Sequence, residues 1–254
     1  MQDLRFWLSV RKKFWREYFF SGEWELRELR KHVRKNSVAI DVGANIGSYS
    51  YHLARFARHV YAFEANPLLV ARFERLRLRR VSVECAALSS SVGIGHLRFP
   101  MLASGREDIG MASLEKSAVE DAALSREIEV PLRRLDDYGF EGVSFIKIDV
   151  EGHEEEVLTG AAATIARERP TLLIEVEERH NQGGLGRIAQ KLAALGYQGY
   201  FFDKGVRRPL GEFDPVKHQL TTSALDDAGH NRRAMAYINN FLFCPSPQLG
   251  TVEN

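Results

Sequence analysis

Residues 38–47 of this 254-residue chain read Val-Ala-Ile-Asp-Val-Gly-Ala-Asn-Ile-Gly. An apolar run that ends at Val42 enters a turn with two glycines, Gly43 and Gly47, and a helical pattern follows. Because glycine has no Cβ, the backbone of such a turn can approach a ligand closely. The free N–H groups at the start of a helix attract a negatively charged group. The stretch therefore predicts a strand, a ligand-binding turn and a helix.

Short apolar runs continue to alternate with longer helical patterns along the chain. Strands separated by helices of about ten to fifteen residues are typical of a parallel sheet, and right-handed crossovers place the helices on both of its faces. We therefore predict an α/β fold. The expected strands are Ser37–Val42, His59–Glu64, Val81–Leu88, Val143–Val150, Thr171–Val176, Tyr197–Asp203 and Asn240–Cys244, and the expected helices are Asn45–Arg58, Asn66–Arg80, Glu154–Arg169 and Leu185–Leu195.

The other segments divide the chain into parts. Residues 37–245 form the expected α/β domain, in which residues 204–239 are a polar connection without an assigned element. Glycines and a proline interrupt residues 89–130, which we interpret as an insertion with a β-hairpin near Gly95–Phe99 and Glu127–Leu132. Residues 1–36 place aromatic and basic side chains at helical intervals. This segment has three possible roles in our interpretation: a helix that packs on the domain, a lid over a substrate pocket, or a surface that contacts a membrane or a partner chain. Residues 246–254 are a polar tail.

Bulk composition narrows the class of protein. Hydrophobic residues make up 44% of the chain and the net charge is +1, so neither disorder nor a nucleic-acid or membrane partner is indicated. No apolar run reaches the roughly 20 residues that span a bilayer, and the N-terminus lacks the pattern of a signal peptide. The two cysteines, Cys85 and Cys244, lie in apolar runs, which is typical of buried thiols in a reducing compartment. We expect a cytoplasmic protein.

The turn after the first strand favours an adenosyl ligand over a dinucleotide. A dinucleotide-binding turn follows the pattern G-x-G-x-x-G, but Asn45 and Ser48 stand where its second and third glycines belong. Asp41 is an unfavourable neighbour for a pyrophosphate and a good one for an ammonium or sulfonium group. Glu64 ends the next strand, 23 residues after Asp41. An acidic side chain at about this spacing accepts hydrogen bonds from ribose hydroxyls.

Four motifs together resemble the FkbM-type methyltransferases. The resemblance covers roughly residues 22–203, and it implies a Rossmann-like class I methyltransferase fold: a seven-stranded, mostly parallel sheet with an antiparallel last strand. The motifs are Asp-Val-Gly-Ala-Asn-Ile-Gly (41–47), Phe-Glu-Ala-Asn-Pro (63–67), Ala-Ala-Leu-Ser (86–89) and Ile-Lys-Ile-Asp-Val-Glu-Gly-His-Glu (146–154).

The resemblance also implies S-adenosylmethionine as cofactor and methyl transfer to a hydroxyl oxygen. The acceptor would be a small molecule, often a sugar of a glycan or a secondary metabolite. Three groups of residues would hold the methionine portion, the ribose and the adenine of the cofactor. Asp41, Gly43, Asn45 and Gly47 would hold the methionine portion, Glu64 the ribose, and Ala86 the adenine. Ala65 and Asn66, which follow Glu64, are also expected in the cofactor site.

Candidate catalytic groups follow the fourth strand. Asp149, Glu151 and His153 occur at its carboxyl end, where ligands sit in open α/β sheets, so Asp149 is expected beside the reactive end of the cofactor. An alcohol acceptor needs a general base, and the ordinary pKa of histidine suits this task. We take His153 as the first candidate for the base and Glu151 as the second. Alternatively, Glu151 and His153 only cap the following helix.

Further alternatives concern the metal, the buried lysine and the function. Asp149 with Glu175 or Glu177 could bind a divalent cation such as Mg²⁺, but a solvated acidic strand end is the simpler interpretation, and we predict no metal site. Lys147, in a buried run, needs a carboxylate partner, Asp41 or Glu175.

A nicotinamide-dependent dehydrogenase and a non-catalytic partner-binding protein are the alternative functions. The oligomeric state is not predicted.

Overall fold

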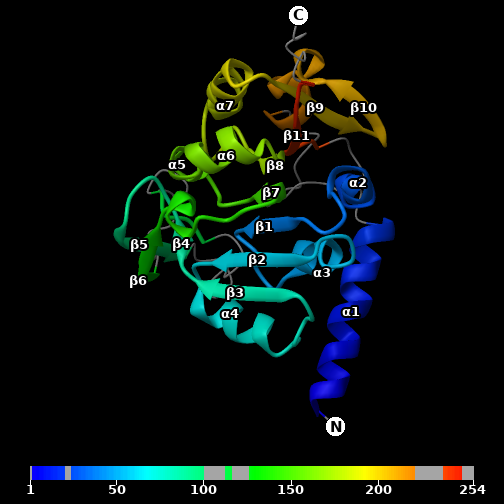
Figure 1. Ribbon diagram of the computed structural model, residues 1–254, viewed down its shortest axis with the longest axis vertical. Helices are drawn as coiled ribbons and strands as arrows, with labels where there is room; N and C mark the ends of the chain where they lie inside the picture. The colour runs from blue at the N-terminus through cyan, green and yellow to red at the C-terminus, as the bar shows by residue number, and fades with distance from the viewer. Residues whose placement is uncertain (1, 21–23, 100–111, 116–125, 221–236, 248–254) are drawn as a thin grey trace, which may run out of the picture.

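The computed structural model describes residues 2–20, 24–99, 112–115, 126–220 and 237–247 of the chain (Figure 1). Its main sheet has the strand order β10-β9-β11-β8-β7-β1-β2-β3. The five strands from β8 to β3 pair in parallel, and β11 is antiparallel to both of its neighbours. The α/β class and the antiparallel last strand are confirmed. The strands are β1 (Val38–Val42), β2 (His59–Glu64), β3 (Val81–Cys85), β7 (Val143–Ile148), β8 (Thr171–Glu175), β9 (Tyr197–Asp203), β10 (Val206–Pro209) and β11 (Asn240–Pro245).

The main sheet has eight strands, not the seven that the family resemblance implied. The additional strand, β10, lies in the segment 204–239 and pairs antiparallel with β9 at the sheet edge. Lys204 and Gly205 join the two strands with φ angles of 49° and 82°, as a two-residue hairpin turn requires. All four residues of β10 are exposed, so its sequence lacks the apolar alternation that identifies a half-buried strand.

Side chains of the main sheet alternate between two apolar layers. On β1, Ile40 and Val42 face one layer, and Ala39 faces the other. Burial on both faces is typical of parallel sheets. It explains why the central strands β1, β7 and β8 are almost wholly apolar. The first layer includes α5 (Glu154–Gly160), α6 (Ala162–Glu168) and α7 (Gly184–Ala194), and the second includes α2 (Glu25–His32) and α3 (Ser48–Leu53).

Two long predicted elements are each divided in the structure. The predicted helix Glu154–Arg169 breaks after Gly160 into α5 and α6. A Cβ on Gly160 would lie 1.9 Å from the Ser89 carbonyl oxygen, so the helix ends where another segment crosses it. The predicted strand Val81–Leu88 divides into β3 and β4 (Ala87–Leu88), and β4 leaves the main sheet to pair with another strand.

A second, smaller sheet has the order β4-β6-β5. The predicted hairpin is confirmed, because β5 (Gly93–Phe99) pairs antiparallel with β6 (Arg126–Arg133). Parts of the predicted insertion, residues 100–111 and 116–125, lie outside the described residues. In Figure 1 the small sheet stands at the left, on the side toward which the arrows of β2 and β3 point. It therefore borders the carboxyl edge of the main sheet, where a ligand is expected.

The N-terminal segment packs on the main domain. Helix α1 (Gln2–Phe20) buries Phe14 completely, in a cluster with Phe73 of α4 (Pro67–Glu74). The Phe14 carbonyl also lies 3.3 Å from Nε2 of His52 in α3. In Figure 1, α1 runs along the side of the main sheet opposite the small sheet. Helix α1 therefore packs on the part of the domain that lies away from the small sheet.

Three smaller expectations can also be compared with the structure. No helix among the described residues is both long and apolar enough to cross a bilayer. Cys85 and Cys244 carry free thiols, but both are half-buried rather than fully buried. Residues 248–254 of the predicted tail lie outside the described residues.

Replacing Phe14 with alanine tests whether α1 is an integral part of the fold. Loss of a fully buried ring should lower the free energy of unfolding by about 3 kcal/mol. Phe19→Ala on the same helix is the matched control, since Phe19 is 53% exposed, and it should cost less than about 1 kcal/mol. Urea denaturation followed by circular dichroism measures both. Equal effects of the two substitutions would contradict the packing described above.

Candidate functional site

The carboxyl edge of the main sheet and the small sheet enclose one cavity. Its volume is about 130 Å³, and its mouth opens to solvent. Its position beside β1, where the chain reverses its direction of growth across the sheet, is the usual binding position in open α/β folds. The walls include Gly43, Asn45, Glu64, Ala65, Leu69, Ala86, Ala87, Leu97, Leu114, Asp149, Glu151, His153 and Glu175.

The turn after β1 lies against the end of β7. Gly43 has a φ angle of 75°, and a Cβ at this position would lie 1.7 Å from the Asp149 carbonyl oxygen. Only glycine combines this conformation with such a close approach. The turn thereby brings Asn45, with a φ angle of 50°, next to the end of β2.

Glu64, at the end of β2, is held by two backbone groups of the neighbouring turns. The Asn45 N–H donates to one carboxylate oxygen and the Asn66 N–H to the other, each at 2.8 Å. Burial raises the pKa of Glu64 to about 7, although both N–H groups oppose the shift. The carboxylate therefore keeps a fixed orientation at the cavity wall and changes its charge near neutral pH.

Six of the nine predicted cofactor residues line the cavity, and three do not. Asp41 is 1% exposed and accepts a hydrogen bond from Ser50 Oγ at 2.6 Å. Burial raises its pKa to about 6. Asp41 thus organises the start of α3 and is not part of the cavity wall. The residues that do line the cavity are Gly43, Asn45, Glu64, Ala65, Ala86 and Asp149.

Gly47 and Asn66 are the other two predicted cofactor residues outside the wall. A Cβ on Gly47 would lie 2.6 Å from the Phe73 ring, so this glycine permits close packing of the turn on α4. The Asn66 side chain accepts a hydrogen bond from the Leu68 N–H and forms the N-cap of α4. Both residues shape the loops around the cavity. The spacing of a motif does not distinguish a residue with this role from one that contacts the ligand.

Carboxylates gather at the ends of β7 and β8. Lys147 is 1% exposed and lies 3.4 Å from Asp149 Oδ2 and 3.6 Å from Glu175 Oε2. Glu175, one of its two predicted partners, is therefore confirmed. The charge of Lys147 also opposes the rise in the pKa of Asp41, the other predicted partner, and Asp149 is an additional partner. Burial and the charge of Asp149 raise the pKa values of Glu151 and Glu175 well above their ordinary range. A cationic or hydrogen-bond-donating ligand would relieve this concentration of negative charge.

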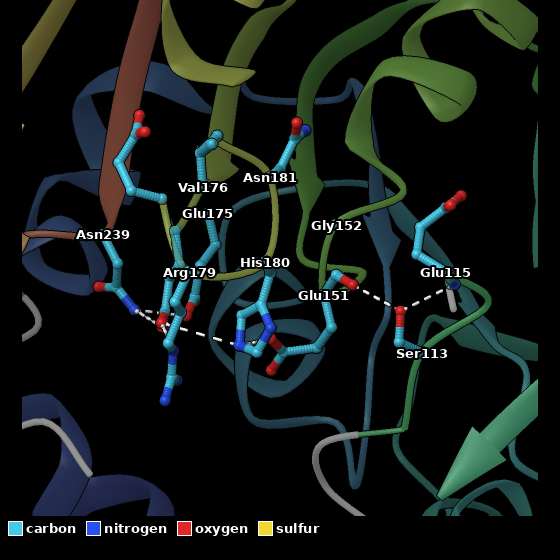
Figure 2. Close-up of polar contacts among 12 residues, drawn as sticks. Ser113, Glu115, Glu151, Gly152, Glu175, Val176, Arg179, His180, Asn181 and Asn239 are labelled. Carbon is cyan, nitrogen blue, oxygen red and sulfur yellow. Dashed lines mark hydrogen bonds and ion pairs between the residues drawn. The ribbon is translucent and has the colours of Figure 1, made fainter. Parts of the chain in front are cut away.

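Glu151 occupies a constrained position between two segments (Figure 2). Its φ angle is 50°, and its carbonyl accepts a hydrogen bond from Ser113 Oγ at 2.6 Å. Its carboxylate lies 3.3 Å from Nε2 of His180. Burial lowers the pKa of His180. The strained backbone and the neighbouring imidazole are features that cluster at functional sites.

His153 makes side-chain contacts on both ring nitrogens. Nδ1 lies 2.7 Å from Glu115 Oε1, and Nε2 lies 3.0 Å from Ser89 Oγ. The hydrogen bond from His153 lowers the pKa of Glu115. His153 stands at the N-cap of α5, but its side chain makes no capping hydrogen bond. The capping alternative therefore does not describe His153, whose ring joins the insertion to the cavity wall.

Ser89, Glu115 and His180 were missed by the sequence analysis. Glu115 comes from the insertion and reaches His153 across 38 residues of sequence, and no local pattern indicates such a contact. Ser89 belongs to the Ala-Ala-Leu-Ser motif, which provided a signal for its position but not for its partner. His180 follows β8 in a loop.

The acidic residues do not form a metal site in the described part of the chain. No group of three or more His, Cys, Asp or Glu residues there is arranged to hold a metal ion. Glu177 was one of the alternative ligands for Mg²⁺. Its carboxylate instead pairs with Arg179 and accepts hydrogen bonds from Tyr237 and Asn239.

Gly43→Ala tests the contact between the β1 turn and β7. The added Cβ has no room and an unfavourable φ, so we expect the free energy of unfolding to fall by about 2–4 kcal/mol. Gly186→Ala, in α7, is the control, because its added Cβ meets nothing within 4 Å outside the backbone of its own helix. This control should be neutral or stabilising by up to about 1 kcal/mol. Urea denaturation compares the two, and an unaltered Gly43→Ala protein would refute the close approach.

Known proteins have sequences similar to that of this chain. A family model described as the methyltransferase FkbM domain matches residues 41–198. Hexuronic acid methyltransferase AglP of Haloferax volcanii is 28% identical over 164 residues, which cover 61% of this chain and 63% of that protein. The 31-O-demethyl-FK506 methyltransferase FkbM of Streptomyces tacrolimicus is 29% identical over 195 residues, which cover 65% of this chain and 74% of that protein.

A solved structure has a similar fold. Methyltransferase FkbM from Methylobacillus flagellatus KT superposes with a TM-score of 0.51 at 15% identity, over 82% of this chain and 43% of that chain. The present chain thus spans less than two thirds of AglP and less than half of this structure. The family model, however, covers more than half of the chain, including the β1 turn, Glu64 and the segment from Asp149 to His153. This chain belongs to the methyltransferase FkbM family.

Proposed function

We propose that the protein is an S-adenosylmethionine-dependent O-methyltransferase with its catalytic domain in residues 37–245. The observation that carries this proposal is the Glu64 carboxylate, which lines the cavity at the end of β2 and is oriented by two backbone N–H groups. Each of its oxygens retains a lone pair for another donor. A carboxylate at this place in an α/β sheet accepts hydrogen bonds from ribose hydroxyls.

The residues on either side of Glu64 fit the two ends of such a cofactor. Ala65, Leu69 and Ala86 offer apolar surface for an adenine ring. At the other end, Asp149 and Glu175 bring negative charge to the cavity wall. This charge suits a sulfonium and opposes a pyrophosphate, which favours an adenosyl cofactor over a dinucleotide. When bound, S-adenosylmethionine would supply an electrophilic methyl group.

The acceptor is expected near the ends of β7 and β8. Carboxylates on the wall there can accept hydrogen bonds from several hydroxyls of one ligand. The two relatives are named for methyl transfer to a hexuronic acid and to 31-O-demethyl-FK506. These names support a hydroxyl of a sugar or a secondary metabolite as the acceptor.

Proton removal from the acceptor is assigned to His153, with Glu115 as its positioning residue. Glu115 holds Nδ1, so Nε2 is the ring atom that takes the proton, after it exchanges its contact with Ser89 Oγ for the acceptor hydroxyl. A carboxylate in this position fixes the tautomer and stabilises the imidazolium. Glu151 is the second candidate, since burial and the charge of Asp149 raise the pKa of its carboxylate well above the ordinary range and make it a stronger base.

Calorimetric titration with S-adenosylhomocysteine tests the cofactor assignment. Because the pKa of Glu64 is raised to about 7, the carboxylate that accepts ribose hydroxyls dominates above this pH and is lost below it. Affinity should therefore rise between about pH 6 and pH 8. Glu64→Gln should weaken binding at least about tenfold at the upper pH and remove the pH dependence.

Glu84→Gln is the matched control for this titration, since Glu84 is an exposed carboxylate on the neighbouring strand β3. It should leave affinity unchanged. Tighter binding of NAD than of S-adenosylhomocysteine would support a dehydrogenase instead. No adenosyl binding by folded protein would support a non-catalytic role.

The base assignment predicts two distinguishable activity losses. His153→Gln should lower kcat by about 10²–10⁴-fold. Glu115→Gln should lower kcat less, because the ring keeps the nitrogen that takes the proton and loses only the carboxylate that fixes its tautomer. Methyl transfer from tritiated S-adenosylmethionine to a panel of glycosides provides the assay. The control is Glu156→Gln, which removes an exposed carboxylate on α5. A His153→Gln protein with full kcat would transfer the assignment of the base to Glu151.

A further inference from the structure

The net charge of +1 is the sum of two oppositely charged parts of the chain. Residues 1–80 contain 17 Lys and Arg against 8 Asp and Glu, whereas residues 81–254 contain 18 Lys and Arg against 26 Asp and Glu. The acidic excess includes Asp149, Glu151 and Glu175 of the cavity. The basic excess belongs to the segment from α1 to α4. Global charge therefore says nothing about the surface that α1 presents.

The outer face of α1 combines basic and apolar side chains. At 3.6 residues per turn, five of the exposed residues of α1 fall within an arc of about 80°, and the exposed Ser9 and Lys13 continue this arc on one side. Leu8 and Phe19 are each 53% exposed and lie almost directly in line along the helix. The cations occupy the adjoining part of the arc, so the two apolar side chains form a strip along one edge of a positively charged surface. The residues of this α1 outer face are Arg5, Leu8, Lys12, Arg16 and Phe19.

The inner face of α1 holds the helix firmly on the domain. Phe14 is fully buried, and Glu17 accepts a hydrogen bond from Ser48 Oγ at 2.7 Å. Two exposed arginines, which follow the C-terminal ends of α3 and α4, border α1. The Arg55 guanidinium lies 4.9 Å from the Trp15 ring centroid, and that of Arg75 lies 4.3 Å from the Phe6 centroid. They extend the positive surface beyond α1 itself.

We propose that the α1 outer face docks the protein on an anionic lipid membrane surface. A helix of this kind lies in the plane of the interface, with apolar side chains among the acyl chains and Lys and Arg among the anionic headgroups. Leu8 and Phe19 would lie among the acyl chains. Arg5, Lys12 and Arg16 would contact the anionic headgroups. Charge complementarity selects an anionic surface over a neutral one.

The apolar side chains favour a membrane over a nucleic acid. Binding of single strands uses aromatic rings as stacking platforms in a basic groove. Here the Trp7 ring is covered by Arg11, with 4.3 Å between guanidinium and centroid, and the Trp15 ring is stacked by Phe19 at 5.6 Å. Leu8 offers no stacking surface at all. Exposed leucine and phenylalanine within a cationic helix face are what insertion into an interface requires.

Docking by this face leaves the cavity open. In Figure 1, α1 lies on the side of the main sheet opposite the small sheet, which borders the cavity. The membrane would therefore hold the protein without covering the site. This inference does not depend on the identity of the cofactor or the acceptor.

Vesicle sedimentation of the full chain tests the proposal. We expect binding to vesicles of phosphatidylcholine mixed with phosphatidylglycerol, little binding to pure phosphatidylcholine, and weaker binding as salt rises. Lys12→Gln/Arg16→Gln should weaken the partition onto anionic vesicles by at least about tenfold. Leu8→Ser/Phe19→Ser should weaken it severalfold and leave its salt dependence in place. All variants alter exposed side chains, and thermal melting checks that each stays folded.

Arg187→Gln/Lys191→Gln is the matched control, because it removes the same charge from the exposed face of α7. It should bind anionic vesicles like the unaltered protein. The proposal is overturned if the chain ignores anionic vesicles, if it binds neutral vesicles equally well, or if the control loses as much binding as Lys12→Gln/Arg16→Gln. Binding of single-stranded RNA that is lost in Lys12→Gln/Arg16→Gln, without vesicle binding, would assign the face to nucleic acid.

Discussion

The approach of the β1 turn to the end of β7 is the constraint on which the site depends. The backbone at Gly43 lies so close to the Asp149 carbonyl that a Cβ would stand 1.7 Å from it. The Gly43 and Ala44 N–H groups both donate to the Phe63 carbonyl on β2, so the same turn is tied to a third strand end. From there the Asn45 N–H reaches Glu64. One short turn thus sets the relative positions of the groups that face both ends of the cavity.

The electrostatics at the carboxyl edge of the main sheet depend on which hydrogen-bond donors or cations lie next to each carboxylate. A buried carboxylate is costly unless it is paired or hydrogen-bonded. Glu64 has two N–H donors, and Lys147 lies between Asp149 and Glu175. One lysine does not neutralise two carboxylates, and the site is therefore prepared for a ligand that brings positive charge or hydrogen-bond donors. Positive charge is concentrated elsewhere, on the helices around α1, so that the two functional surfaces that we propose have opposite signs.

Most of the main sheet could be predicted from the sequence because its central strands, β1, β7 and β8, are buried on both faces and read as apolar runs. The exception, β10, is an exposed edge strand whose order comes from pairing with β9. In the site, Gly43, Asn45 and Glu64 could be located by spacing, since a turn and a strand end determine their positions. The role of Asp41 could not, because the same motif position serves either a ligand or, as here, Ser50. Glu115 depends on a contact made by the insertion, which no periodicity encodes.

A crystal structure of the protein with S-adenosylhomocysteine tests the central claim, that the β1 turn and Glu64 form the cofactor site, most directly. The account predicts that both ribose hydroxyls lie within hydrogen-bond distance of the Glu64 carboxylate. It also predicts that the adenine lies against Ala86 and that the sulfur lies toward Asp149. A well-ordered ligand in another cavity, or in this cavity without contact to Glu64, would contradict the account.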